Sequence, residues 1–142
     1  GPLGRWFEMS TVKAANLQST GSGAPTFQNS SGTEIGQLAR AWINFNGEST
    51  VAIRDSFNVS SLTDSAEGRY VVNFATALPN ANYILAGYVN DATSRCGIFG
   101  TDEAQPDFQT GSAKIYTSYI SGTNGACAYM DAEFVHCVFF GA

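Results

Sequence analysis

The sequence predicts an all-β protein, an antiparallel β-sandwich of jelly-roll or immunoglobulin-like type with an extended N-terminal arm. Short runs of β-branched and aromatic residues recur along the chain, with turn signals about every 8–12 residues between them. No long segment has helical periodicity. In residues 69–76, Tyr70, Val72 and Phe74 alternate with other residues at period two, which is typical of a half-buried antiparallel strand.

The individual strands follow from the same signals. Residues 40–90 predict a meander in which Asn46-Gly47 breaks the first strand, and Glu67-Gly68 connects two strands as a hairpin turn. The segment 133–140 is almost entirely apolar, which predicts a place in the middle of a sheet or under a partner subunit. The remaining strands are predicted over residues 83–89, 95–101, 113–120 and 126–130.

Three parts are predicted along the chain. Residues 1–8 resemble the scar left when an affinity tag is removed, and we expect them to be vector-derived. Residues 9–38 form an arm and linker rich in Ser, Thr, Gly and Asn, and residues 39–142 form the sandwich. The segment 33–41 fits either a brief helical turn or an extended lead into the first strand.

The arm has too little apolar surface to fold alone, so we expect it to pack on the sandwich or to wind with other chains. Only 13% of the 142 residues are charged, against about a quarter in a typical soluble domain, which predicts surface buried between copies. The apolar residues of the arm and one residue of the last strand are the candidates for this interface: Val12, Leu17, Phe27, Ile35, Leu38 and Phe139.

The net charge of −5, with only seven Lys and Arg, argues against a nucleic-acid partner, because phosphate binding needs a basic face. No apolar run reaches 18 residues and no secretory leader is recognised, so neither membrane insertion nor secretion is expected.

The cysteines predict neither a disulfide framework nor a metal site. Cys96, Cys127 and Cys137 have no CxxC spacing, and their odd number favours a reducing compartment. A zinc site of three cysteines and His136 is the alternative, but neighbouring residues on a strand face opposite sides of the sheet. We therefore predict buried core thiols, a partly buried His136 with one hydrogen bond, no metal and no cofactor.

Several residues allow both a functional and a structural interpretation. The acids of the loop 102–111 could hold calcium or a sugar, and the alternative is simple solvation. The sequons at Asn29 and Asn58 are interpreted as polar turns. Several aromatic residues could stack on sugar rings or could lie in the core or a subunit interface, namely Tyr88, Phe108, Tyr116, Tyr119 and Tyr129.

Three segments resemble a known module. AWINFNG (41–47), VAIRDSFNVSSLTD (51–64) and RYVVNFATALPNANY (69–83) are similar to a module of bacteriophage tail fibres and related virion appendages, familiar from phages of marine bacteria including cyanophages. There it typically reads WVNFNG, a strand with NVSS, a Gly-containing turn, and a strand ending in NANY. The resemblance covers most of residues 9–89.

This resemblance implies a non-enzymatic virion structural protein, made in the host cytoplasm. It also implies a homotrimer with the arm near the symmetry axis, other virion proteins as partners, and a host-surface glycan or protein as receptor. The variable loops 90–94, 102–111 and 121–125 are where receptor contacts are expected, with Asp91, Asp102, Asp107, Phe108 and Asn124 as candidates.

Two alternatives remain open at this stage. The first is a capsid-decorating or head-fibre protein without a host ligand. The second is a glycan depolymerase, which would need two carboxylates placed across a groove.

Overall fold

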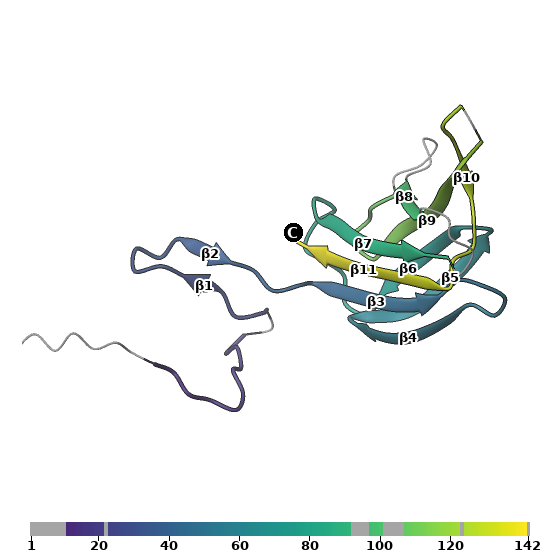
Figure 1. The fold of residues 1–142 in the computed structure, drawn as a ribbon. Helices are drawn as coiled ribbons and strands as arrows, with labels where there is room; N and C mark the ends of the chain where they lie inside the picture. Colours follow the sequence, from purple (N-terminus) through teal and green to yellow (C-terminus); the bar gives the residue numbers. More distant parts are fainter. Residues whose placement is uncertain (1–10, 22, 92–96, 101–106, 123, 142) are drawn as a thin grey trace, which may run out of the picture. The chain divides into compact units, whose positions relative to one another are not determined.

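The chain divides into two compact units, residues 1–36 and 37–142. The computed structural model describes residues 11–21, 23–91, 97–100, 107–122 and 124–141 (Figure 1). In the first unit, β1 (Phe27–Gln28) and β2 (Glu34–Gly36) form an antiparallel hairpin. The side chain of Asn29 organises its turn by accepting hydrogen bonds from the backbone N–H groups of Ser31 (3.0 Å) and Thr33 (2.9 Å). Residues 34–36 are thus extended, and the helical alternative for this segment is wrong.

The second unit is a pair of antiparallel sheets, as the sequence predicts, and no helix occurs in the described residues. One sheet has four strands in the order β4-β3-β11-β7. These strands are β3 (Ala41–Asn46), β4 (Ala52–Phe57), β7 (Ile84–Asn90) and β11 (Phe134–Phe140). The apolar last strand, β11, lies between β3 and β7, so the prediction that it occupies the middle of a sheet is confirmed.

The other sheet has five strands, in the order β10-β9-β6-β5, with β8 also paired to β9. The long strand β9 pairs with β6 through residues 112–116 and with β10 through residues 118–121. The strands are β5 (Val59–Ala66), β6 (Arg69–Phe74), β8 (Gly97–Gly100), β9 (Ser112–Ser121) and β10 (Ala126–Tyr129).

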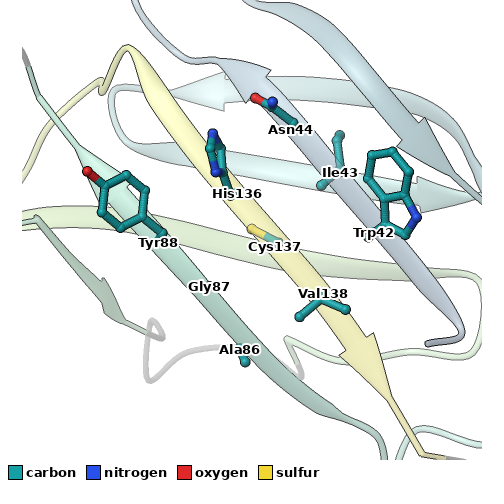
Figure 2. Close-up of a pocket in the computed structure, with 9 residues that line it drawn as sticks. All are labelled: Trp42, Ile43, Asn44, Ala86, Gly87, Tyr88, His136, Cys137 and Val138. Carbon is teal, nitrogen blue, oxygen red and sulfur yellow. The ribbon is translucent and has the colours of Figure 1, made fainter. Parts of the chain in front are cut away.

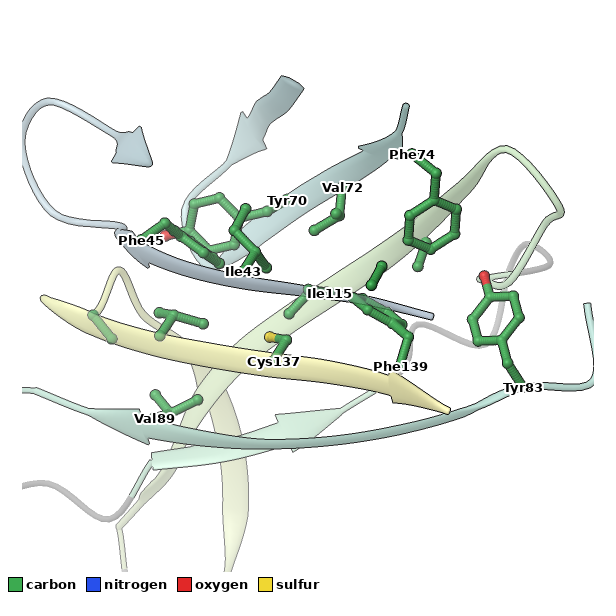
Figure 3. Close-up of a cluster of buried hydrophobic side chains, with 14 of the residues drawn as sticks. Ile43, Phe45, Tyr70, Val72, Phe74, Tyr83, Val89, Ile115, Cys137 and Phe139 are labelled. Carbon is green, nitrogen blue, oxygen red and sulfur yellow. The ribbon is translucent and has the colours of Figure 1, made fainter. Parts of the chain in front are cut away.

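The two sheets enclose one core (Figure 3). Burial alternates along β3 and β6, because every second side chain of a strand points to the same side of its sheet. Aromatic rings meet edge to face across the interior, with Phe45 and Tyr70 at 5.0 Å and Phe74 and Phe139 at 5.2 Å between centroids. The largest fully buried side chains are those of Tyr70, Phe45, Phe139, Ile43, Ile115, Val72, Val135 and Thr117.

A buried polar network closes one end of the sandwich. The Tyr70 hydroxyl hydrogen-bonds to the Asp131 carboxylate (2.8 Å) and to the Gly47 carbonyl (3.1 Å). The same Asp131 oxygen accepts a hydrogen bond from the Gly68 N–H (2.8 Å). Burial, and then the bond to Asp131, raises the pKa of Tyr70, so this hydroxyl stays protonated. The network therefore joins the turn after β3 to the β5–β6 hairpin.

Gly47 is confined by this network. A Cβ atom at position 47 would lie 2.5 Å from the Tyr70 hydroxyl and 2.9 Å from the Ala132 carbonyl oxygen, both too close. The preceding Asn46 braces the same turn, since its side chain donates to the carbonyls of Glu48 (2.9 Å) and Thr50 (3.1 Å). The break predicted at Asn46-Gly47 is confirmed. Position 47 has no room for a side chain, and the Asn46 side chain supplies the hydrogen bonds of the turn.

Asn58 lies between β4 and β5, where the chain passes from one sheet to the other. Its backbone has φ +54°, a left-handed conformation that asparagine tolerates better than most residues. The side-chain amide donates to the carbonyls of Arg40 (3.0 Å) and Thr76 (3.1 Å), and its oxygen accepts from the Thr76 N–H (2.8 Å). Both ends of the amide therefore hold neighbouring segments together at this corner.

Candidate functional site: the outer face of the four-stranded sheet

The face of the four-stranded sheet that points away from the core carries a two-row grid of side chains. Pairing of β11 with both neighbours places His136 between Asn44 and Tyr88. One step along the sheet, Val138 lies between Trp42 and Ala86. We call these residues the outer face: Trp42, Asn44, Ala86, Tyr88, His136 and Val138.

The outer face contains a shallow apolar hollow of about 260 Å³ (Figure 2). Side chains from β3, β11 and β7 line it, with Trp42 on one side and Tyr88 on the other. The rings of Tyr88 and His136 lie 5.6 Å apart at 48°, so they form a tilted aromatic pair. Tyr88 remains 52% exposed.

Further apolar side chains extend this surface. Phe57 pairs with Trp42 across β4 and β3, and Ile84 pairs with Phe140 across β7 and β11. Phe57 is 54% exposed and Ile84 is 65% exposed. At the other end, the Arg54 guanidinium lies 4.7 Å from the centroid of the Phe134 ring. The six residues of the outer face include no carboxylate and no ammonium group.

The outer face is apolar and uncharged, so covering it with another protein surface would remove water from it at little cost. Removing apolar area from water is favourable by about 25 cal/mol per Å² before the entropy cost of association is subtracted. Sheet faces without charges lose little hydration energy on contact. The Asn44 amide and His136 imidazole add hydrogen-bonding groups at one side of the hollow, which can fix the register of a partner.

Sequence reasoning assigned no role to this surface as a whole. Tyr88 was named as a possible stacking residue, but Trp42 was interpreted only as a strand residue. The predicted burial of His136 is wrong, because its side chain is exposed on the outer face beside Tyr88. The strand alternation that separates His136 from the buried Cys137 is confirmed.

One interface candidate has to be corrected. Phe139 is fully buried in the core of its own chain, with its ring 5.2 Å from Phe74 and 5.9 Å from Tyr83. The alternation of β11 turns residue 139 inward with Val135 and Cys137. The other five candidates are exposed and stay predictions, with exposed fractions of 84% for Val12, 67% for Leu17, 41% for Phe27, 68% for Ile35 and 50% for Leu38.

The receptor-contact candidates are dispersed. Asp91 is only 5% exposed and is therefore wrong as a surface contact. Phe108 packs partly against the core, 5.1 Å from the Tyr83 ring. The backbone carbonyl of Asp107 accepts a hydrogen bond from the Lys114 N–H (2.7 Å). Asn124 is exposed, whereas Asp102 lies outside the described residues. Asp107, Phe108 and Asn124 stay predictions.

The cysteine predictions have mixed outcomes. Cys137 is buried, and burial raises the pKa of its thiol. Cys127 is exposed on β10, so the prediction of a buried thiol is wrong there, and Cys96 lies outside the described residues. Within the described ranges no group of three or more His, Cys, Asp or Glu side chains could hold a metal ion.

Glu48 lies near three other acids, Asp91, Glu133 and Asp131. The pKa of its carboxyl is raised, first by partial burial and then by a hydrogen bond to Asp91. The negative charges of the three acids raise this pKa further. A raised pKa in the folded state means that this group stabilises the fold below its ordinary value of 4.5 and that this stabilisation is lost as the pH rises through the raised pKa. We expect Glu48→Gln to raise the thermal midpoint at pH 7 and to give no gain at pH 4.

Thermal unfolding at both pH values tests this expectation. Glu34→Gln, which removes the same charge in the β1–β2 hairpin, is the control. An equal gain from Glu48→Gln at both pH values would show that the acids around position 48 do not repel one another in the folded protein.

Comparison with known proteins places the chain in no characterised group. No protein-family model matches it, and neither a curated protein nor a solved structure does. In the described part of the chain, no helix is long and apolar enough to cross a membrane. The class that the described residues define is an all-β protein whose second unit is a pair of antiparallel sheets.

Proposed function

We propose that the chain is a non-enzymatic structural protein of a bacteriophage virion, of tail-fibre type, which assembles as a homotrimer and contributes to recognition of the host surface. The observation that carries this proposal is the uncharged, aromatic outer face that spans β3, β11 and β7 of the four-stranded sheet. A face of this composition matches the apolar interfaces of obligate oligomers.

In this proposal the outer face packs against a second copy of the chain. Trp42 and Tyr88 act as aromatic anchors, and the apolar side chains around them complete the contact. Only 13% of the whole chain is charged, which also favours association of copies. The number three and the virion location come from the resemblance of residues 41–83 to tail-fibre modules.

The exposed apolar residues of the first unit give independent support. Val12 and Leu17 lie in a segment without regular secondary structure, and both are largely exposed. Side chains of this kind gain stability when several arms wind together, because each chain then covers the apolar residues of the others. Trimeric assembly of the arms would keep the sandwiches together and multiply weak receptor contacts.

A glutamate at position 86 tests the interface. Ala86 is exposed on β7, at one side of the outer face, so Ala86→Glu adds a charge there without touching the core. We expect light scattering to give a mass near three times 15.1 kDa for the native chain and a fall toward the mass of one protomer for the variant. The cause is the cost of burying an unpaired carboxylate.

Ala126→Glu is the matched control, since Ala126 is also exposed but lies on β10 of the other sheet. It should leave the mass unchanged, and circular dichroism should show the same β-rich spectrum for all three proteins. A native chain that is a monomer at micromolar concentration would contradict the trimer. A trimer that survives Ala86→Glu would place the interface elsewhere.

Host recognition is tested separately on a glycan array. Binding without turnover of the glycan supports the proposed role. Binding to phage capsids together with no binding to any glycan or host cell would instead favour the capsid-decorating alternative.

A further inference from the structure

A second hollow lies on the five-stranded sheet, and its lining is cationic. It has a volume of about 240 Å³ and spans three neighbouring strands, β5, β6 and β9. The lining residues are Ser65, Arg69, Tyr70, Val71, Lys114 and Tyr116. We call it the cationic pocket.

The register of β6 and β9 places both positive charges on one side of the sheet. Arg69 pairs with Tyr116, and Val71 pairs with Lys114, so Arg69 and Lys114 are diagonal neighbours across the two strands. Such diagonal positions are roughly 7–8 Å apart, a span that long side chains can close around one small group. The two cations can therefore converge on a single ligand.

Among the described residues, no carboxylate neutralises these two charges. In the described part of the chain neither Arg69 nor Lys114 forms an ion pair with a carboxylate, and no acidic residue lines the pocket. The chain has a net charge of −5 and only seven Lys and Arg. Two of those seven in one pocket are a local reversal of the overall charge, which attracts an anion.

An aromatic ring packs against the arginine side chain. The Arg69 guanidinium lies 4.2 Å from the centroid of Tyr129, and the Tyr129 ring lies 6.0 Å from that of Tyr116. A cation–π contact of this kind leaves the N–H donors of the guanidinium free to face a ligand. Holding the side chain in advance lowers the entropy lost on binding.

We propose that the cationic pocket binds the anionic group of an acidic saccharide, a carboxylate or a phosphate carried on a sugar. The planar guanidinium matches either group with two parallel hydrogen bonds, and Lys114 adds a second charge. The Ser65 hydroxyl and the aromatic surface of Tyr116 provide groups for the sugar itself. A volume below the roughly 300 Å³ of pockets for drug-sized ligands suits one sugar unit.

This inference rests on the proposed role in host recognition and gives its receptor a chemical class. It places recognition on the sheet opposite the proposed subunit interface. Both surfaces can therefore be used at once, and three pockets in one trimer would add weak contacts into useful avidity.

The test is binding of the full chain to three immobilised sugars: glucuronic acid, glucose 6-phosphate and glucose. We expect retention on one or both acidic sugars, no retention on glucose, and weakening as sodium chloride is raised from low to physiological concentration, because salt screens the attraction. Retention on glucuronic acid alone identifies a carboxylate receptor, and retention on glucose 6-phosphate alone identifies a phosphorylated one.

Arg69→Gln and Lys114→Gln should each weaken binding at least about tenfold, because each removes a charge-assisted hydrogen bond. Arg54→Gln is the matched control, since Arg54 also lies over an aromatic ring, that of Phe134, but on the other sheet. It should bind like the native chain. Arg69→Lys keeps the charge and should recover part of the affinity if Arg69→Gln folds poorly.

Equal retention on glucose, no retention on either acidic sugar, or native affinity in both glutamine variants would overturn the proposal. The experiments distinguish failure of the sugar-binding proposal from failure of the trimer proposal. A monomeric chain that binds acidic sugars overturns the trimer alone, whereas a trimer that ignores them overturns the cationic pocket alone.

Discussion

Gly68→Ala is expected to destabilise the sandwich by about 3–5 kcal/mol. Gly68 has φ +63°, and a Cβ atom there would collide with the backbone carbonyl oxygen of Thr117 and lie 2.8 Å from the backbone of Met130. These are backbone atoms of paired strands, which cannot rotate away. The Gly68 N–H also donates to Asp131, so displacing it disturbs the buried Tyr70 network.

Gly122→Ala separates the two causes. Gly122 has φ +74°, but no atom lies within 4 Å of its added Cβ, so only the conformational cost of about 1 kcal/mol remains. Chemical denaturation of both variants measures the difference. Equal losses would show that the left-handed backbone alone accounts for the effect and that the sheet tolerates a methyl group at position 68.

Asn58→Ala is expected to cost about 2–4 kcal/mol, because three side-chain hydrogen bonds are lost and alanine is strained at positive φ. The carbonyls of Arg40 and Thr76 lose their donors, and the Thr76 N–H loses its acceptor. The segments at Arg40 and Thr76 would therefore both lose their attachment to the corner between the two sheets. Asn58→Gly relieves the backbone strain and should recover only the smaller part of the loss.

Asn73→Ala is the matched control for the corner. The Asn73 amide donates to two hydroxyls, those of Ser61 (3.1 Å) and Thr63 (3.2 Å), on an exposed sheet surface where water can replace it. We expect a loss below about 1 kcal/mol in thermal or denaturant unfolding. If Asn73→Ala cost as much as Asn58→Ala, the corner would have no special structural role.

The positions that carry the resemblance to tail-fibre modules have clear physical roles in this fold. Gly47 of the NFNG segment fits beneath the Tyr70 hydroxyl, and Asn58 of the NVSS segment holds the corner between the sheets. Gly68 occupies the tight turn between β5 and β6. These residues maintain the shape of the sandwich.

Much of the fold could be predicted because the relevant signals are local. Alternation in β6, the turn at Gly68 and the apolar character of β11 each depend on a few neighbouring residues. The face that each residue of β11 presents was harder. Apolar side chains occupy both phases of that strand, so the sequence alone did not show that Phe139 points inward and Val138 outward.

The candidate sites depended on pairing between distant segments. Trp42, Tyr88 and His136 lie on one face because β3 and β7 pair with opposite edges of β11. Arg69 and Lys114 line one pocket because β6 pairs with β9 in one particular register. Nothing in the local pattern of either strand specifies its partner or the register, since any two apolar strands can satisfy each other's backbone hydrogen bonds.

The sequence by itself determined the all-β class and the position of the main turns, and it limited the last strand to the middle of a sheet or a place under a partner subunit. It did so because period-two alternation, turn chemistry and apolar runs are properties of short segments. Only the tertiary structure decided which residues share a surface: the buried position of Phe139 and Asp91, the aromatic outer face and the cationic pocket. Those depend on strand order and register, which arise from packing two whole sheets around one core.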